Sequence, residues 1–395
     1  MSRLAELRNS RRANWIFAGA ALLFAILLPL FLNPLNGFID RSVIALAYVV
    51  MALGLNVVVG FAGLLDLGYV AFYAIGAYSA GWFASDYFSG ANNKHGVHVL
   101  VQGKAAESSL SHTPTAGIHL NFLIVLIIAV CLTALAGMII GLPTLRLRGD
   151  YIAIVTLAFG EIVGTIAVNG DAISVPFTHN ATLTNGQQAI SPLDPLSLPI
   201  LGEFNQATNI RPFYWVALGL VVFTLFVNFR LRDSRLGRAW IALREDEVAA
   251  ASMGVPLVRT KLLAYATGAA LGGMAGAFLG YYINSVNAGT FEFAFSIFVL
   301  AMVILGGLGS IWGVVVGALS LSYINYYLIP DVFNDIPGKL GLDFSLTQLS
   351  FGIFGFLLVI MMVLRPAGLI PERRRKLELE EGVGSGETEL FEVRA

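Results

Sequence analysis

Charge is scarce in this chain. Only 12% of its 395 residues are Asp, Glu, Lys or Arg, whereas 57% are hydrophobic. A soluble domain of this size would need far more surface charge, so the composition excludes one. The net charge of −1, without basic patches interleaved with aromatics, excludes broad nucleic-acid binding. The single cysteine, Cys131, lies within an apolar run and excludes a disulfide framework.

Motifs for catalysis and for energy coupling are also missing. The sequence contains no GxxxxGK[ST] phosphate loop, nucleophile elbow or kinase motif set. The stretch HGVH places His95 and His98 at a spacing that could ligate a metal, but no cysteine or acidic partner accompanies them. We therefore expect neither a catalytic site nor a bound metal or cofactor in this chain.

Long apolar runs are what the sequence does have, and runs of this length are typical of helices that cross a bilayer. We expect an all-α polytopic membrane protein with about ten transmembrane helices. The stretch GGLGS (306–310) must form a turn between the eighth and ninth helices, and a re-entrant hairpin over 293–329 is the alternative there. The expected helices are 14–32, 42–60, 67–85, 120–141, 151–168, 213–230, 260–283, 293–307, 311–329 and 348–364.

The basic residues predict how these helices are oriented. With both termini in the cytoplasm, 19 of the 24 lysines and arginines fall on the cytoplasmic side, as membrane proteins prefer. A basic N-terminus (1–13) then precedes a transmembrane domain (14–365), and a cytoplasmic tail (366–395) has the composition of a disordered segment. The domain carries long outer loops at 86–119 and 169–212 and a cytoplasmic loop at 231–259.

Glycine recurs every fourth residue in the seventh expected helix, at Gly268, Gly272, Gly276 and Gly280. This spacing places the four glycines on one helix face, where a neighbouring backbone can approach closely. The neighbour is either another helix of this chain or another subunit, and the sequence leaves both open.

Ionisable residues inside the expected helices are rare. Glu161 lies within the fifth helix, where a carboxylate usually faces a cavity or a partner. It is a candidate for the translocation path, and a structural contact with a neighbouring helix is the alternative. Asp66 and Glu292 lie near helix ends and are expected at the membrane interface. A proton-coupled transporter would need several such groups on different helices.

The cytoplasmic loop contains the stretch REDEVAAASMG (244–254). Acidic residues favour the first turn of a helix, and glycine followed by proline ends one. We therefore expect a short helix from Leu243 to Met253 that stops at Gly254. Its small residues (249–251) would leave a face that another protein could approach closely, and a solvated amphipathic turn is the alternative.

This acidic, alanine-rich, glycine-ended loop resembles the loop of ATP-binding cassette (ABC) importer permeases that docks into the ATPase subunits. Several further blocks resemble the branched-chain amino acid permease family of LivM type, in the expected order over residues 42–371. They are GLLDLGYVAFYAIGAYSAG (63–81), GLPTLRLRGDYIAIVTLAFGEIV (141–163), LGRAWIALREDEVAAASMGV (236–255), VILGGLGSIWG (303–313) and LRPAGLIP (364–371).

The resemblance implies an ABC importer permease fold in the bacterial inner membrane. It also implies a second permease of LivH type, two ATPases of LivG and LivF type that use ATP and magnesium, and a periplasmic or tethered solute-binding protein. Leucine, isoleucine and valine are the expected cargo, with urea, short amides and aromatic acids as alternatives. A secondary transporter or an intramembrane enzyme is a less favoured alternative for the class of protein. The residues implied in ATPase coupling are Glu245, Asp246, Glu247, Ala249, Ala250 and Gly254.

Three stretches depart from the family pattern. The turns at 184–189 and 286–291 differ from the usual ones, and the loop 86–119 is longer. All three are expected on the outer side. They therefore bear on the cargo and on the fit of the binding protein, and not on the coupling to ATP.

Overall fold

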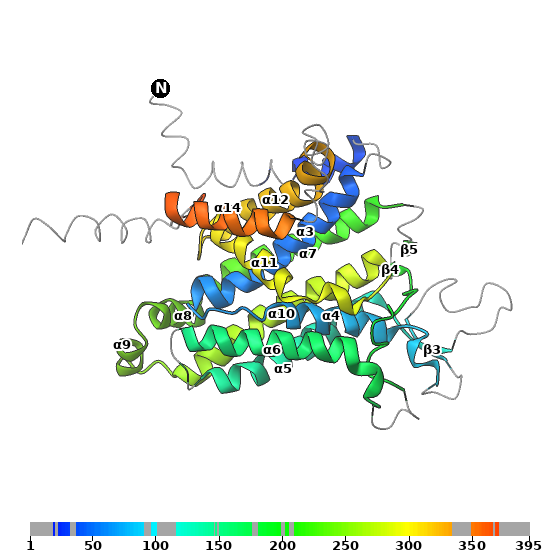
Figure 1. Ribbon diagram of the computed structural model, residues 1–395, viewed down its shortest axis with the longest axis horizontal. Coiled ribbons are helices and arrows are strands. Elements are labelled where there is room, and N and C mark those ends of the chain that lie inside the picture. Colours follow the sequence, from blue (N-terminus) through cyan, green and yellow to red (C-terminus); the bar gives the residue numbers. More distant parts are fainter. Residues whose placement is uncertain are drawn as a thin grey trace, which may run out of the picture.

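The structure is a computed structural model that describes residues 19, 23–31, 37–90, 96–100, 116–145, 147, 150–175, 181–198, 202–204, 209–333, 349–365 and 368–370. The expected basic N-terminus (1–13), nearly all of the tail (366–395) and about half of the first expected membrane helix (14–32) lie outside these residues. The described part is mostly helical, with small strands gathered at one end of the helix bundle and α9 at the other (Figure 1). We call these two ends the sheet end and the α9 end.

From residue 37 onward the described bundle has nine longer helices and two short ones, and residues 23–31 are helical as well. A π-helix, η2 (Asn56–Phe61), continues α3, and another, η7 (Ile324–Phe333), continues α12. The short helices α8 (Arg235–Glu245) and α9 (Glu247–Ser252) lie between α7 and α10. The longer helices are α3 (Phe38–Leu55), α4 (Val70–Phe83), α5 (Phe122–Thr144), α6 (Asp150–Asn169), α7 (Arg211–Arg232), α10 (Leu257–Ile283), α11 (Phe293–Gly306), α12 (Ile311–Tyr323) and α14 (Ser350–Leu364).

Seven helical stretches among the described residues are long and apolar enough to cross a membrane. Each matches one expected helix to within a few residues. The expected segments 67–85 and 348–364 contain α4 and α14, which are shorter, at 14 and 15 residues. The seven stretches are Phe38–Phe61, Phe122–Thr144, Tyr151–Ala172, Arg211–Arg232, Leu257–Ile283, Ala288–Gly306 and Ile311–Pro330.

The expectation of an all-α chain missed two small sheets at the sheet end. One has the order β1-β3-β2 and is formed by β1 (Ala84–Ser85), β2 (Gly96–Val99) and β3 (Gly117–Leu120). Strand β3 pairs antiparallel with β1 and parallel with β2. The other sheet pairs β4 (Leu196–Leu198) antiparallel with β5 (Gly202–Phe204). These strands have only two to four residues, too few for an alternating pattern to reveal them.

A histidine–aspartate pair joins the two long loops at the sheet end. His119 on β3 places Nδ1 2.9 Å from both carboxylate oxygens of Asp194, and its ring stacks on that of His98 with centroids 4.8 Å apart. Burial disfavours the charged imidazole, but the hydrogen bond and negative charge of Asp194 outweigh it and raise the pKa of His119. The pair therefore stabilises the fold most while His119 is protonated, and this contribution fades as pH rises through the raised pKa.

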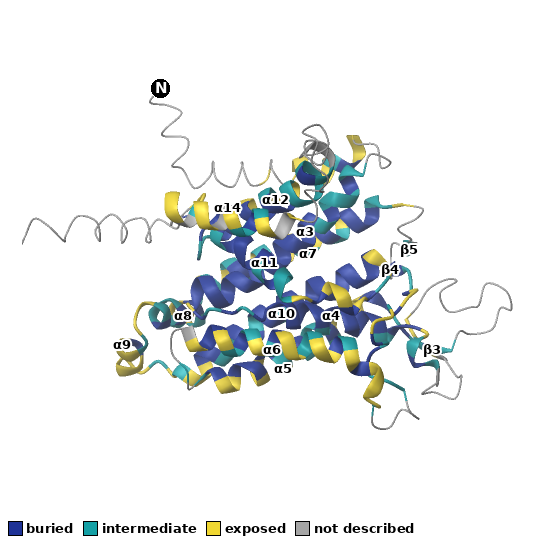
Figure 2. Cartoon of the chain, in the orientation of Figure 1, coloured by how far each residue is buried: buried dark blue, intermediate teal, exposed yellow. Residues whose placement is uncertain are grey.

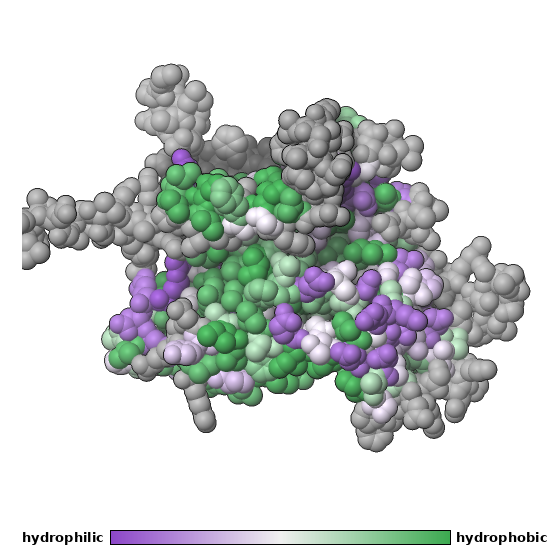
Figure 3. Space-filling view, in the orientation of Figure 1, coloured by the Kyte–Doolittle hydropathy of each residue, from purple (hydrophilic) through white to green (hydrophobic). Residues whose placement is uncertain are grey.

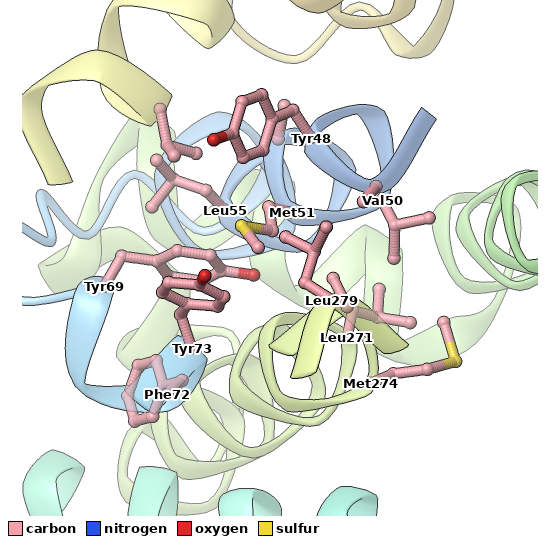
Figure 4. Packing of buried hydrophobic residues seen from close by; sticks show 14 of the residues in the cluster. Tyr48, Val50, Met51, Leu55, Tyr69, Phe72, Tyr73, Leu271, Met274 and Leu279 are labelled. Carbon is pink, nitrogen blue, oxygen red and sulfur yellow. The ribbon is translucent and has the colours of Figure 1, made fainter. Parts of the chain in front are cut away.

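Helix α10 is the centre of the bundle, because it packs against α3, α4 and α5. Figure 4 shows the layer where side chains of α3, α4 and α10 meet, with Tyr69 and Tyr73 close together on one side of Met51 and Leu271. Helices α5 and α6 expose much of their length on the outside of the bundle (Figure 2). Apolar burial between helices gains little over lipid, so close packing and hydrogen bonds must hold such helices together.

The evenly spaced glycines of α10 supply that close packing inside this chain. Gly268 faces Gly54 and Val58 of α3 and η2, Gly272 faces Tyr69, and Gly276 faces Tyr73. Gly280 faces Ala77 and Ala80 of α4. A methyl group on Gly276 would lie only 2.3 Å from the carbonyl oxygen of Tyr73, which no side chain can tolerate. All four glycines therefore face α3, η2 or the α4 region of the same chain.

Residues 62–69 between η2 and α4 are mostly buried but not helical, so their N–H groups need partners other than the next helical turn. Leu67 N–H donates to the Thr156 hydroxyl at 3.0 Å, and Gly68 N–H donates to Asp66 Oδ1 at 2.9 Å. Asp66 is only 2% exposed, so its carboxylate lies inside the protein and faces neither solvent nor lipid headgroups. Its carboxylate instead satisfies backbone that has left the helical pattern.

The contact between α10 and α4 gives a direct test of the packing. Gly276→Ala should force the two backbones apart and destabilise the fold by about 2 kcal/mol, as overpacking does. Gly219→Ala on α7 is the matched control, because nothing lies within 4 Å of the added methyl group. Thermal unfolding followed by size-exclusion chromatography in detergent should show a lower midpoint for the first variant only. Equal midpoints would contradict the packing.

Candidate functional site

The most prominent feature of the α9 end is the loop that carries α8 and α9, which projects from the bundle (Figure 1). The Ser234 hydroxyl caps α8 by accepting from Gly237 N–H at 3.1 Å. Asp246 is extended, with φ −155° and ψ 114°, and its Oδ1 accepts from the N–H groups of Val248 at 2.7 Å and Ala249 at 3.0 Å. An aspartate that bonds following backbone N–H groups begins a new helix.

The expectation of one helix from Leu243 to Met253 is therefore wrong. The chain breaks at Asp246, which closes α8 and caps α9. Gly254 ends the loop in the left-handed region, with φ +84°, as expected from its place before a proline. Open space surrounds Gly254, so backbone conformation and not crowding requires glycine there.

The outward face of α9 differs from the expected one. Ala249 and Ala251 are exposed as expected, but Ala250 is only 4% exposed and faces its own chain, so it is not part of the open surface proposed for residues 249–251. A helix buries one side even when every residue is small, and Ala250 lies on that side. Val248 and Met253 are 61% and 85% exposed, and sequence reasoning did not single them out. Hydrophilic atoms surround this end of the molecule in Figure 3.

Buried polar contacts anchor α8 and α9 to α10. Lys261 Nζ lies 2.7 Å from Glu247 Oε1, and the lysine side chain is only 2% exposed. Trp240, fully buried, donates from Nε1 to the Thr260 carbonyl at 2.9 Å. A buried lysine needs such a partner, so losing Glu247 would leave an uncompensated charge. Glu247 thus holds the loop, whereas Glu245 and Asp246 are exposed beside α9.

A second region of interest lies halfway along α6. Glu161 is exposed and makes no hydrogen bond or ion pair within the part of the chain that the structure describes. It lines a hollow of about 310 Å³ together with Glu292, Thr165 and Phe291, and we call this the carboxylate hollow. The hollow lies between α6 and residues 288–293, which precede and begin α11. Glu161 and Glu292 thus border the same hollow, although they are far apart in the sequence.

The candidate residues form two groups and not one site. Glu245, Asp246, Glu247, Ala249, Ala250 and Gly254 lie together on the loop at the α9 end, whereas Glu161 lies along α6 in the bundle. No cluster of three or more histidine, cysteine or acidic residues suited to a metal occurs among the residues described. The arrangement offers a protruding surface at one end and an acidic hollow on the side.

The role of the exposed tip of α9 in docking can be tested by replacing its apolar side chains with charged ones. Val248→Glu combined with Met253→Glu should leave folding and membrane insertion intact, because both side chains lie in solvent. It should reduce co-purification of the implied ATPase subunits at least tenfold, since apolar anchors at an interface contribute about 2 kcal/mol or more. Val97→Glu on β2, at the opposite end, is the control and should change nothing. Unaltered co-purification of the double variant would exclude α9 as the docking surface.

Comparison with known proteins covers most of the chain. Residues 38–363 match the family described as "Branched-chain amino acid transport system / permease component". The chain is 36% identical over 392 residues to the high-affinity branched-chain amino acid transport system permease protein LivM of Salmonella typhimurium, covering 94% of this chain and 78% of the relative. The probable LivM permease of Methanocaldococcus jannaschii is 28% identical over 337 residues, covering 82% of this chain and 91% of the relative.

A more distant match is to the Escherichia coli permease protein LivH, 26% identical over 191 residues, covering 48% of this chain and 54% of the relative. No solved structure matches the chain. The family match and the LivM relatives together cover all seven candidate membrane spans. This chain therefore belongs to the family of permease components of branched-chain amino acid transport systems.

Proposed function

We propose that this chain is the membrane-spanning permease subunit of an ABC importer that carries leucine, isoleucine and valine into the cell. The observation that carries the proposal is the family match over residues 38–363, which includes the loop with α8 and α9 as well as α6. The chain itself binds no nucleotide in this proposal. Separate ATPase subunits of LivG and LivF type hydrolyse ATP with magnesium.

The loop at the α9 end suits docking to those ATPases. It is anchored by Trp240 and Lys261, so a push on α9 would move the loop as a unit. The exposed Val248 and Met253 provide apolar contacts that a groove could bury. The docking surface is then shaped and bordered by Glu245, Asp246, Glu247, Ala249 and Gly254. Ala250 supports it from inside.

The proposal includes an orientation. Seven lysines and arginines between residues 230 and 261 support a cytoplasmic α9 end, and the sheet end would then face outward. About ten helices in the inner membrane, with both termini cytoplasmic, complete the proposed topology. The sheet end would meet a periplasmic or tethered solute-binding protein, and the unusual turns at 184–189 and 286–291 would adjust that fit.

The carboxylate hollow supports a path between two permeases. An exposed acidic pair along a membrane helix is costly when it faces lipid, and such groups usually line a cavity. A second permease of LivH type covering this face of α6 would enclose Glu161 and Glu292 in a shared passage. The two carboxylates would attract the ammonium group of an amino acid.

Uptake by the assembled transporter tests the proposed function. The chain, its permease partner, the two ATPases and the binding protein would be purified together and placed in proteoliposomes. We expect inward transport of labelled leucine that requires both ATP and the binding protein and is reduced by unlabelled isoleucine and valine. Transport driven by an ion gradient without ATP, or competition by urea alone, would contradict the proposal.

If Glu161 lines the translocation path, replacing it should change transport without changing assembly. Glu161→Gln keeps the shape of the side chain and removes its charge, so we expect normal assembly and at least a tenfold lower rate of leucine uptake. The control is Asp171→Asn. Asp171 is exposed and lies just after α6 at the sheet end, so this variant should show normal transport. Normal transport by the Glu161 variant would remove that residue from the path, and failed assembly would assign it a structural role.

A further inference from the structure

Three segments meet near the cytoplasmic end of α3 at a point that we call the junction, formed by Asn56, Gly60, Gly63, Arg244 and Gly309. Arg244, near the end of α8, donates from Nη1 to the carbonyl oxygen of Gly60 at 2.5 Å. Gly309, in the turn between α11 and α12, donates its N–H to Asn56 Oδ1 at 2.9 Å. Asn56 is fully buried, so this contact is shielded from water.

The local backbone explains why the junction needs Arg244. At residue 56 the helix widens into the π-helix η2, where Ala62 N–H bonds to the carbonyl oxygen of Val57 at 3.2 Å. The chain leaves the helix at Ala62, and the last carbonyl groups of a helix lack partners in a following turn. Arg244 supplies a charged donor to one of them, the Gly60 carbonyl. Helix α8 is therefore bonded to the backbone of η2.

The junction also has little free space. A methyl group on Gly60 would lie 2.7 Å from the nitrogen of Gly309, and one on Gly63 would lie 2.7 Å from Cγ of Arg244. Gly63 moreover has φ +70°, a conformation that favours glycine. Parts packed this closely transmit a displacement rather than absorbing it.

From the junction, residues 62–69 and the start of α4 lead to α6 and α11, the two helices that border the carboxylate hollow. The N–H of Leu67 donates to the hydroxyl of Thr156 at 3.0 Å, and that of Val70 donates to the hydroxyl of Ser296 at 2.9 Å. Thr156 is on α6 and Ser296 is on α11, and the hollow lies between α6 and the segment that leads into α11. A continuous series of hydrogen bonds and backbone segments thus connects Arg244 with α6 and α11, which border the hollow.

On its other side, Arg244 directly precedes the exposed tip. Only Glu245 separates it from Asp246, whose carboxylate begins α9. Any movement of α9 by a docked partner therefore reaches Arg244 through one turn of backbone. Arg238 lies on the same helix but is exposed, and its Nη1 donates to the nearby carbonyl of Asp233 at 3.0 Å.

We propose that Arg244 is a positioning residue that passes the movement of α9 to residues 62–69 and so to the carboxylate hollow. This inference rests on the proposed function, because it assumes that ATPases move α9. Arg244 touches no solute and no nucleotide. Its role is to couple the movement of the cytoplasmic loop to the solute path, so that ATP hydrolysis and solute release occur together.

The test compares Arg244→Gln, Arg244→Lys and the control Arg238→Gln in the complete reconstituted transporter. Glutamine removes the charge and shortens the reach to Gly60, whereas lysine keeps a charged donor. We expect Arg244→Gln to retain its ATPase partners and its ATP hydrolysis but to raise the ATP consumed per leucine transported at least tenfold. Arg244→Lys should recover part of this ratio, and Arg238→Gln should match the unmodified protein.

A ratio for Arg244→Gln within twofold of the unmodified protein would overturn the inference. Poor accumulation of both Arg244 variants would also overturn it, because Arg244 would then hold the fold together instead of transmitting movement. These failures differ from a failure of the proposed function, in which the unmodified transporter itself would show no uptake that depends on ATP.

Discussion

The close backbone contact between α10 and α4 is the constraint on which the rest of the bundle depends. Gly276 and Gly76 each lie so near the facing backbone that an added methyl group would clash with a carbonyl oxygen. Helices in lipid gain little from apolar burial alone, so such contacts must supply the stability. The contact positions α4 against α10 and so constrains the path of the non-helical residues 62–69 that lead into α4.

Those non-helical residues connect stability with function. Backbone that leaves a helix inside a membrane protein must be bonded by other protein groups, and here Asp66, Thr156 and Ser296 provide them. The bonds to Thr156 and Ser296 tie Leu67 to α6 and Val70, the first residue of α4, to α11. A structural requirement, the satisfaction of backbone N–H groups, thereby joins the core of the bundle to the two elements that border the carboxylate hollow.

The sequence predicted the elements whose signal is local and missed those that arise from tertiary contacts. Long apolar runs located the seven membrane spans, and Gly254 located the end of α9. The break at Asp246 was missed because aspartate is compatible with both a first helical turn and a cap. Ala250 was assigned to the wrong face, and the burial of Lys261 beside Glu247 depends on how α8 and α9 fold back onto α10.

The central claim is that α9 is the contact through which ATPase subunits act on this chain. Replacing Met253 with a photo-crosslinking amino acid in the assembled transporter tests it most directly, because that side chain is 85% exposed at the tip of the loop. We expect illumination in membranes to join this position to an ATP-binding cassette subunit, identified by mass spectrometry. Crosslinks only to lipid or to unrelated proteins, from a transporter that still takes up leucine, would contradict the claim.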